Sequence, residues 1–303
     1  MKQLIIPPYL KEGDHVEIVS PSGVIDRDIV LKAAKKLEAS GLVVTIGKNA
    51  FKNNGCFAGT DLERLSDLQE ATSDPDIKAV FCSRGGYGVS RIIDRVDFSP
   101  LKENPKWYIG FSDITVLHLW LSKMCGMVSL HGEMPLNYFN PKKSVNCYDT
   151  MINALFGKPE AITWKCNREA NIDVTGPVTG GNLSLIYSLI GTPAEPDTDG
   201  SILFIEDVGE FYYHLDRMLT SMRLSGCLSN LRALVVGGME RITEGSMPYN
   251  SSIEEIILDI VGQYNYPVLF NFPAGHISDN RAIYIGREAR LLQERKEASL
   301  MYI

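Results

Sequence analysis

A serine stands where an apolar strand is expected to turn into a helix, in the segment 109–115 with the sequence IGFSDIT. A serine at such a turn projects its hydroxyl out of the sheet, and the N–H groups that follow point at whatever lies beside it. This geometry is a nucleophile elbow, in which backbone donors stabilise a developing oxyanion. The segment therefore indicates acyl transfer with Ser112 as the nucleophile. Because Ser112-Asp113 also suits an ordinary helix N-cap, both interpretations stay open.

Chemically useful side chains also follow three other expected strands. They are Arg84 with Gly85 and Gly86 after 79–82, Glu206 after 202–205, and His276 after 268–272. Ligands and catalysts in open α/β sheets gather at the carboxyl ends of the strands. A nucleophile, a carboxylate, an imidazole and glycine-rich backbone donors are the components of a serine hydrolase. Simpler explanations exist for each: an ion pair for Glu206, a loop position for His276 and a tight turn for the glycines.

The first half of the chain alternates apolar strands with amphipathic helices, which must position these residues. Strands are expected at 16–19, 42–46, 79–82, 107–109 and 127–130. Helices are expected at 27–39, from Asp61 as the cap to about 74, at about 89–95, and from Ser112 to about 124. Repeated βα units predict a mostly parallel sheet with helices on both faces.

Turn-forming residues are frequent from 140 to 180, around one short helix expected at about 147–156, and we place a domain boundary there. The chain would then divide into an N-terminal α/β domain, residues 1–160, and a C-terminal α/β domain with a mixed sheet, residues 161–303. In the second domain, helices are expected up to Ile190 and at 212–224 and 251–263, and strands at 202–205, 234–238, 268–272, 283–285 and 298–303.

The composition is that of an ordinary globular protein, with 45% hydrophobic and 22% charged residues in a chain of 303. A formal net charge of −7, without any Lys/Arg-rich run, argues against a nucleic-acid partner. The six cysteines form no C-x-x-C pair and are expected to be reduced. The sequence shows neither a secretion signal nor an apolar run of membrane-spanning length, so we expect a cytoplasmic protein without a membrane partner.

Motifs for a metal or a nucleotide cofactor are missing from the sequence. There is no H-E-x-x-H, no Cys/His cluster with zinc spacing and no G-x-x-x-x-G-K-[ST], and Gly86-Tyr87-Gly88 lacks the third glycine of a dinucleotide loop. We therefore expect neither a metal nor a cofactor. The remaining histidines carry no specific signal, although His131 could line the same cleft as Ser112. The others are His15, His118 and His214.

Six short motifs occur along the chain: 10–14 (LKEGD) with 20–22 (SPS), 84–88 (RGGYG), 110–115 (GFSDIT), 180–183 (GGNL), 205–207 (IED) and 273–276 (PAGH). Together they resemble the L,D-carboxypeptidases of the S66 serine peptidase group, which includes muropeptide carboxypeptidases and microcin C immunity peptidases. The resemblance implies a Ser-Glu-His triad on Ser112, Glu206 and His276. Glu210 is a nearby alternative, and Glu206 is preferred because it ends an apolar strand.

The resemblance also implies an oxyanion hole made by the backbone N–H groups of Gly86 and Asp113. The serine would lie in the N-terminal domain and the glutamate and histidine in the C-terminal domain, with the site in the cleft between them. A homodimer is implied as well. A carboxypeptidase must bind a terminal carboxylate, and Arg84 is a candidate for this, although it could instead brace its own loop.

The function implied by the resemblance is a serine carboxypeptidase that cleaves the bond between an L-centre and a C-terminal D-residue, releasing D-alanine from murein tetrapeptides in cell-wall recycling. Its partner would be a small peptide substrate. A microcin-immunity-type peptidase that cuts aminoacyl-nucleotide amides is an alternative, and would need an aromatic platform, for which Trp164, Tyr187 and Tyr213 are candidates. A further alternative is a non-catalytic cytosolic protein that binds peptides or sugars.

Overall fold

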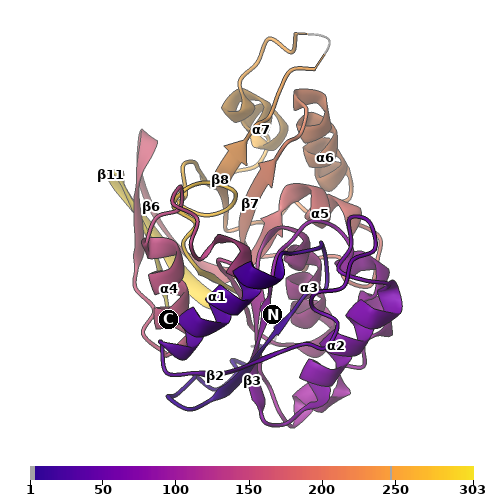
Figure 1. Ribbon diagram of the computed structural model, residues 1–303. Helices are drawn as coiled ribbons and strands as arrows, with labels where there is room; N and C mark the ends of the chain where they lie inside the picture. The colour runs from indigo at the N-terminus through magenta and orange to yellow at the C-terminus, as the bar shows by residue number, and fades with distance from the viewer. Residues whose placement is uncertain (1–3, 246–247) are drawn as a thin grey trace. The chain divides into compact units, whose positions relative to one another are not determined.

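The chain folds into two compact units, each built around its own sheet (Figure 1). The computed structural model describes residues 4–245 and 248–303. The first unit consists of residues 1–159 with 278–285, and the second of residues 160–277 with 286–303. The sequence predicted a single boundary after residue 160. The structure differs in that residues 278–285 belong to the first unit.

A six-stranded sheet in the order β10-β5-β4-β3-β1-β2 forms the centre of the first unit. Its strands are β1 (His15–Val19), β2 (Val43–Ile46), β3 (Ile77–Cys82), β4 (Trp107–Gly110), β5 (Ser129–His131) and β10 (Ile283–Ile285). The first five run parallel to their neighbours, and β10 pairs antiparallel with β5. Every residue of β4 is buried, as in a sheet covered on both faces. The predicted α/β class with a mostly parallel first sheet is confirmed.

The helices of the first unit are α1 (Arg27–Glu38), α2 (Asp61–Ser73), α3 (Thr115–Trp120) and α4 (Asn146–Leu155). The apolar face predicted for α1 is the buried one. The cap of α2 is Thr60 and not Asp61 as predicted, because Thr60 and Glu63 bond each other's backbone N–H groups in a capping box. Two of the otherwise unpaired N–H groups at this helix end are satisfied in this way.

Two expected helices in the first unit differ from their predictions. Residues 89–95 form two 3₁₀ turns, Val89–Arg91 and Ile93–Arg95, since the segment is too short for a stable α-helix. The helix after Ser112 begins with a 3₁₀ turn, Ser112–Ile114, continues as α3 and ends in a π-helical turn, Leu121–Cys125. Gly126 then stops it in the left-handed conformation that commonly ends helices.

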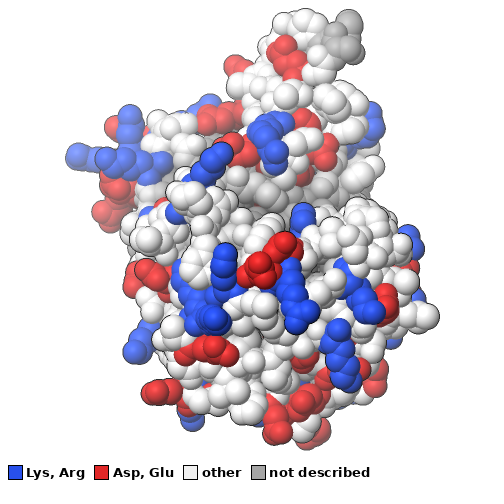
Figure 2. Space-filling view, in the orientation of Figure 1, with Lys and Arg blue, Asp and Glu red and all other residues white. Residues whose placement is uncertain are grey.

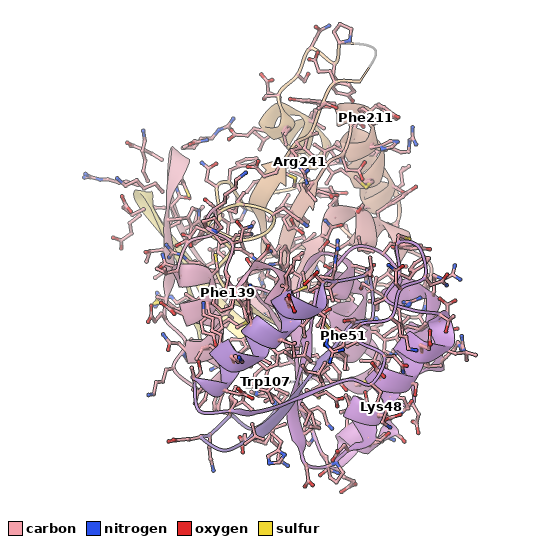
Figure 3. All side chains as sticks on the ribbon, in the orientation of Figure 1. Lys48, Phe51, Trp107, Phe139, Phe211 and Arg241 are labelled. Carbon is pink, nitrogen blue, oxygen red and sulfur yellow. The ribbon has the colours of Figure 1, made fainter. Side chains whose placement is uncertain are left out.

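Aromatic packing holds β4 in the first unit. The Trp107 ring (labelled in Figure 3) lies between Tyr9 and Tyr284, with ring centroids 6.1 and 5.4 Å away. Its Nε1 donates to the carbonyl of Pro8 at 2.9 Å. Trp107 begins the strand that leads to Ser112. These contacts therefore fix the position of β4, and with it the position of Ser112.

The second unit contains a five-stranded sheet in the order β11-β6-β7-β8-β9. Its strands are β6 (Ile162–Asn182), β7 (Ile202–Val208), β8 (Ala233–Glu240), β9 (Val268–Leu269) and β11 (Glu288–Tyr302). Strands β6 to β9 are parallel, and β11 pairs antiparallel with β6. The predicted mixed sheet is confirmed.

The turn-rich character predicted up to residue 180 is wrong for β6, which is one strand of 21 residues. Its polar residues stay extended because β11 pairs with the strand at residues 162–165 and 170–177. Ile162, Trp164 and Cys166 are buried and alternate with exposed residues, the pattern of a strand with one covered face.

Helices α5 (Leu183–Ser188), α6 (Tyr212–Leu224) and α7 (Ile253–Val261) complete the second unit. Helices α6 and α7 contact each other beside β7 and β8 (Figure 1). No helix in the described ranges meets the length and hydropathy that a membrane crossing requires. Acidic and basic side chains are interspersed on the face drawn in Figure 2.

Candidate active site

Ser112 has a strained backbone at the end of β4. Its φ of 64° lies in the left-handed region, which few residues other than glycine adopt. The turn is tight, since a Cβ on Gly110 would lie 2.8 Å from Cγ1 of Ile114. The helix cap position falls on Phe111 and carries no side-chain hydrogen bond. These features match a nucleophile elbow and not the alternative of an N-cap serine.

The loop after β3 brings the backbone of Gly85 against this serine. A Cβ on Gly85 would lie 2.9 Å from Cβ and 3.1 Å from Oγ of Ser112, so a glycine is needed for the approach. Gly86 follows with a φ of 118°. Among the described residues, neither the N–H of Gly86 nor that of Asp113 donates to a protein acceptor. Two backbone donors are therefore available on the segments that flank Ser112.

Arg84 makes contacts that brace this loop. Its Nη1 donates to the carbonyl of Val24 at 2.8 Å, and its Nε donates to the carbonyl of Gly85 at 3.2 Å. The side chain is partly buried. Of the two roles considered for Arg84, these bonds favour bracing over the binding of a substrate carboxylate.

Glu206 and His276 form a hydrogen-bonded pair in the second unit. Oε2 of Glu206 accepts from Nδ1 of His276 at 2.7 Å and from the His276 backbone N–H at 3.2 Å. Oε1 accepts from Nδ2 of Asn182 at 3.3 Å, and the glutamate is fully buried. A carboxylate that accepts from Nδ1–H selects the tautomer in which Nε2 carries no proton and can act as a base. The pair thus has the form of a base with its orienting acid.

The close approach of the two residues depends on Gly275. A Cβ at this position would lie 2.7 Å from both Cβ and Oε2 of Glu206, and its φ is 105°. On the next position of β7, Asp207 accepts from the backbone N–H groups of Ser184 and Val208 and from Asn182 Nδ2. Burial, with a smaller contribution from the charge of Glu206, raises the pKa of Asp207 to about 6.

Glu210, the alternative acid, pairs with a different histidine. Its Oε2 lies 2.8 Å from Nδ1 of His214, one helical turn further along the chain, and both side chains are partly exposed. Oε2 of Glu206, by contrast, lies 2.7 Å from Nδ1 of His276. Each of the two glutamates is thus close to a histidine, which is why the sequence alone left either of them as a candidate for the acid.

Two histidines have structural contacts that sequence reasoning did not find. His118 is fully buried, with Nε2 2.8 Å from the carbonyl of Gly110 and Nδ1 2.9 Å from Oγ of Ser129. Burial lowers its pKa to about 3, so the imidazole is neutral at physiological pH. His118 therefore fixes the end of β4 directly before the serine turn. His131 bonds Asn280 through Nε2 at 3.2 Å.

The described residues contain no group of three or more His, Cys, Asp or Glu side chains that could hold a metal ion. The candidate residues are instead a serine, an imidazole, a carboxylate and backbone donors. Glu206 lies within β7, and the others lie on segments that follow parallel strands.

Comparison with known proteins identifies the family. Two family models match the chain, the LD-carboxypeptidase N-terminal domain at residues 16–132 and the LD-carboxypeptidase C-terminal domain at residues 175–291. A probable murein peptide carboxypeptidase of Bacillus subtilis is 34% identical, over 96% of this chain and 93% of that protein. This chain belongs to the LD-carboxypeptidase family. Ser112 falls within the first matched range, and Glu206 and His276 within the second.

Other known proteins are similar in sequence or in fold. A murein tetrapeptide carboxypeptidase of Pseudomonas aeruginosa is 30% identical, over 91% of this chain and 92% of its own. The crystal structure of a muramoyltetrapeptide carboxypeptidase from Oxalobacter formigenes superposes with a TM-score of 0.87 at 29% identity, over 95% of this chain and 98% of that one. The microcin C7 self-immunity protein MccF, in complex with aspartyl sulfamoyl adenosine, has a TM-score of 0.88 at 22% identity, over 98% of both chains, and shares the fold.

Proposed function

We propose that this protein is a serine carboxypeptidase that releases the C-terminal D-residue from murein tetrapeptides. Ser112 is the nucleophile, His276 the general base and Glu206 the acid that orients it. The observation that carries the proposal is the left-handed backbone of Ser112 against Gly85, in a chain of the LD-carboxypeptidase family. A serine is held in such a conformation where its hydroxyl must be presented to a substrate.

The proposed reaction begins with attack by Ser112 Oγ on the carbonyl carbon that precedes the D-residue, while Nε2 of His276 takes the hydroxyl proton. Glu206 keeps Nδ1 protonated and stabilises the imidazolium. The N–H groups of Gly86 and Asp113 bind the oxyanion, and each such donor is typically worth about 10²–10³ in rate. The imidazolium then protonates the leaving amine, and water hydrolyses the acyl-enzyme. The reaction requires Oγ of Ser112 and Nε2 of His276 to come within hydrogen-bond reach of each other.

The choice of murein peptides is supported by the names of the relatives from Bacillus subtilis and Pseudomonas aeruginosa, which align over more than nine-tenths of this chain. The proposal includes the L,D-specificity, the recycling role, the cytoplasmic location and the homodimer that the family resemblance implies. It includes no metal or cofactor, since the chemistry described needs none.

A second candidate function is the cleavage of an aminoacyl-nucleotide amide, which the fold likeness to MccF keeps open. Of the three aromatic residues considered for a base platform, Trp164 is buried against Phe272, with ring centroids 4.9 Å apart, and its Nε1 donates to the carbonyl of Phe270. Trp164 is therefore a core residue. Tyr187 and Tyr213 are more than a third exposed, and Tyr213 stacks on Phe211 (labelled in Figure 3).

One side-by-side assay separates these functions. The purified protein is incubated with a murein tetrapeptide or with aspartyl sulfamoyl adenosine, and the products are detected by mass. Release of D-alanine, lost in Ser112→Ala, supports the carboxypeptidase, whereas release of aspartate alone supports the second candidate. Binding of the tetrapeptide without turnover, and without labelling by a serine-directed phosphonate, identifies a binding protein. If Ser112→Ala releases D-alanine at the parental rate, the nucleophile assignment is wrong.

A further inference from the structure

A fully buried arginine in the first unit joins two loops near Ser112. Arg64 on α2 is 1% exposed, and its Nη1 donates to the carbonyls of Pro21 and Gly88, the latter at 2.9 Å. Its Nη2 donates to Asp61. Arginine is almost never fully buried unless its charge is paired. Here those donors connect the loop at 20–23 with the glycine loop at 85–88.

Asp113 also connects these two segments, but as a hydrogen-bond acceptor, whereas Arg64 is a donor. Its Oδ2 accepts from Oγ of Ser22 at 2.6 Å and from the backbone N–H of Val89 at 3.0 Å. Ser22 belongs to the first loop, and Val89 directly follows the second. The cation of Arg64 therefore binds carbonyl groups of the two loops, while the carboxylate of Asp113 binds a donor in the first loop and one directly after the second. We call Arg64, Ser22 and Asp113 the loop clamp.

The two loops also bond each other directly. The N–H of Gly23 donates to the carbonyl of Gly85 at 3.2 Å. In a planar trans peptide the carbonyl and the following N–H point in opposite directions, so this bond aims the N–H of Gly86 away from Gly23. The loop that holds Gly23 therefore sets the direction of one of the two proposed oxyanion donors.

Gly88 shows how closely the loop clamp fits. A Cβ at Gly88 would lie 2.5 Å from Nη1 of Arg64 and 3.2 Å from the ring of Phe57. The guanidinium fills the space that the missing side chain leaves, with its Cζ 5.0 Å from the centroid of the Phe57 ring. In the RGGYG segment, Gly85 thus makes room for Ser112 and Gly88 makes room for Arg64. Two of its glycines therefore permit close approaches.

We propose that Arg64 and Asp113, with Ser22, are positioning residues that hold the N–H of Gly86 in the direction needed to bind the oxyanion. The inference rests on the proposed function, because it assumes Gly86 as an oxyanion donor and Ser112 as the nucleophile. An oxyanion donor acts on the transition state, so its misplacement lowers kcat and leaves KM nearly unchanged.

The test uses three variants of the loop clamp and one matched control. Arg64→Lys keeps the charge but has no planar fork to reach both carbonyls. Asp113→Asn keeps the size of the side chain, and Ser22→Ala removes one hydroxyl. The control is Arg91→Lys, since Arg91 bonds the same Asp61 from an exposed position. Thermal unfolding midpoints identify any variant that does not fold.

We expect kcat on the murein tetrapeptide to fall about 10- to 100-fold in Arg64→Lys and Asp113→Asn, and less in Ser22→Ala, with KM within about twofold of the parent. Arg91→Lys keeps the parental kcat. A parental kcat in folded Arg64→Lys and Asp113→Asn overturns the loop clamp while leaving the Ser112 assignment intact.

A second measurement does not depend on activity. Amide hydrogen exchange of residues 83–89 is expected to accelerate about tenfold or more in the loop-clamp variants and to stay parental in Arg91→Lys. Unchanged exchange in all three variants overturns the proposal even if the parent protein does not cleave the tetrapeptide. Accelerated exchange in a parent without turnover supports the loop clamp and rejects the proposed function alone.

Discussion

The backbone of Gly85 rests directly on Ser112, where a single added methyl group would come within 2.9 Å of the serine Cβ. We predict that Gly85→Ala lowers kcat by about 100-fold or more, because either the serine or the glycine loop must shift. The control is Gly126→Ala, where the left-handed φ of 62° is strained but nothing lies within 4 Å of the new Cβ. It should cost about 1 kcal/mol of stability and leave kcat unchanged. Equal kinetics of the two variants would contradict the contact.

The left-handed backbone of Ser112 predicts that the conformation needed for activity lowers the stability of the protein. Ser112→Gly and Ser112→Ala should both be inactive, but only glycine relieves the strain at a φ of 64°. We expect Ser112→Gly to be about 1 kcal/mol more stable than Ser112→Ala in urea unfolding at the same pH. An alanine variant as stable as the glycine variant would show that the turn stores no strain.

The bond between Glu206 and His276 predicts which carboxylate supports catalysis. Glu206→Gln should lower kcat by up to about 10⁴-fold, since an amide can hold the imidazole in the wrong tautomer. Glu210→Gln is the matched control, because Glu210 bonds His214 instead, and it should keep most of the parental kcat. If steady-state kinetics gave the lower kcat for Glu210→Gln and a near-parental kcat for Glu206→Gln, Glu210 would be the catalytic carboxylate.

The half-buried Glu17 on β1 predicts a pH dependence of stability. Burial, followed by the charges of Asp67, Glu70 and Asp74, raises its pKa from 4.5 to about 7. The folded protein therefore holds this proton more tightly than the unfolded chain does, and stability falls as the pH rises from about 4.5 to 7. The cost above pH 7 is about 1–2 kcal/mol once solvent screening is allowed for.

Glu17→Gln should remove this part of the pH dependence. Urea unfolding at pH 5 and pH 8 measures it, with the exposed Glu38→Gln as the control. We expect the loss of stability between the two pH values to be smaller in Glu17→Gln than in the parent and unchanged in Glu38→Gln. An identical loss in all three proteins would place the titrating group elsewhere.

Elements whose signal is local were predicted well. The helices at 27–38 and 212–224 match their apolar spacing, and the strand at 202–208 matches its run of buried residues. A strained φ is not visible in the sequence, but a serine between an apolar strand and a helix was enough to single out Ser112. The pairing of Glu206 with His276 remained open from sequence because 70 residues separate the two side chains.

Features that depend on distant partners were missed. The long strand β6 contains a polar stretch that only its pairing with β11 keeps extended. Arg64 was not singled out, since on a helix its spacing is that of any surface residue, whereas its carbonyl partners lie 43 and 24 residues away. The 20–22 motif was noted without a role, and its Ser22 bonds Asp113 across 91 residues.

The return of residues 278–285 to the first unit has a consequence for biosynthesis. Strand β10 closes the edge of the first sheet at β5, and Tyr284 donates to the carbonyl of Ala154 at 2.6 Å. A growing chain that folds from its N-terminus has no β10 until residues 283–285 have left the ribosome. Until then, one edge of β5 in the first sheet has no partner strand. If the gene were divided after residue 160, the first fragment would lack β10 and the second would carry a strand that belongs to the other unit.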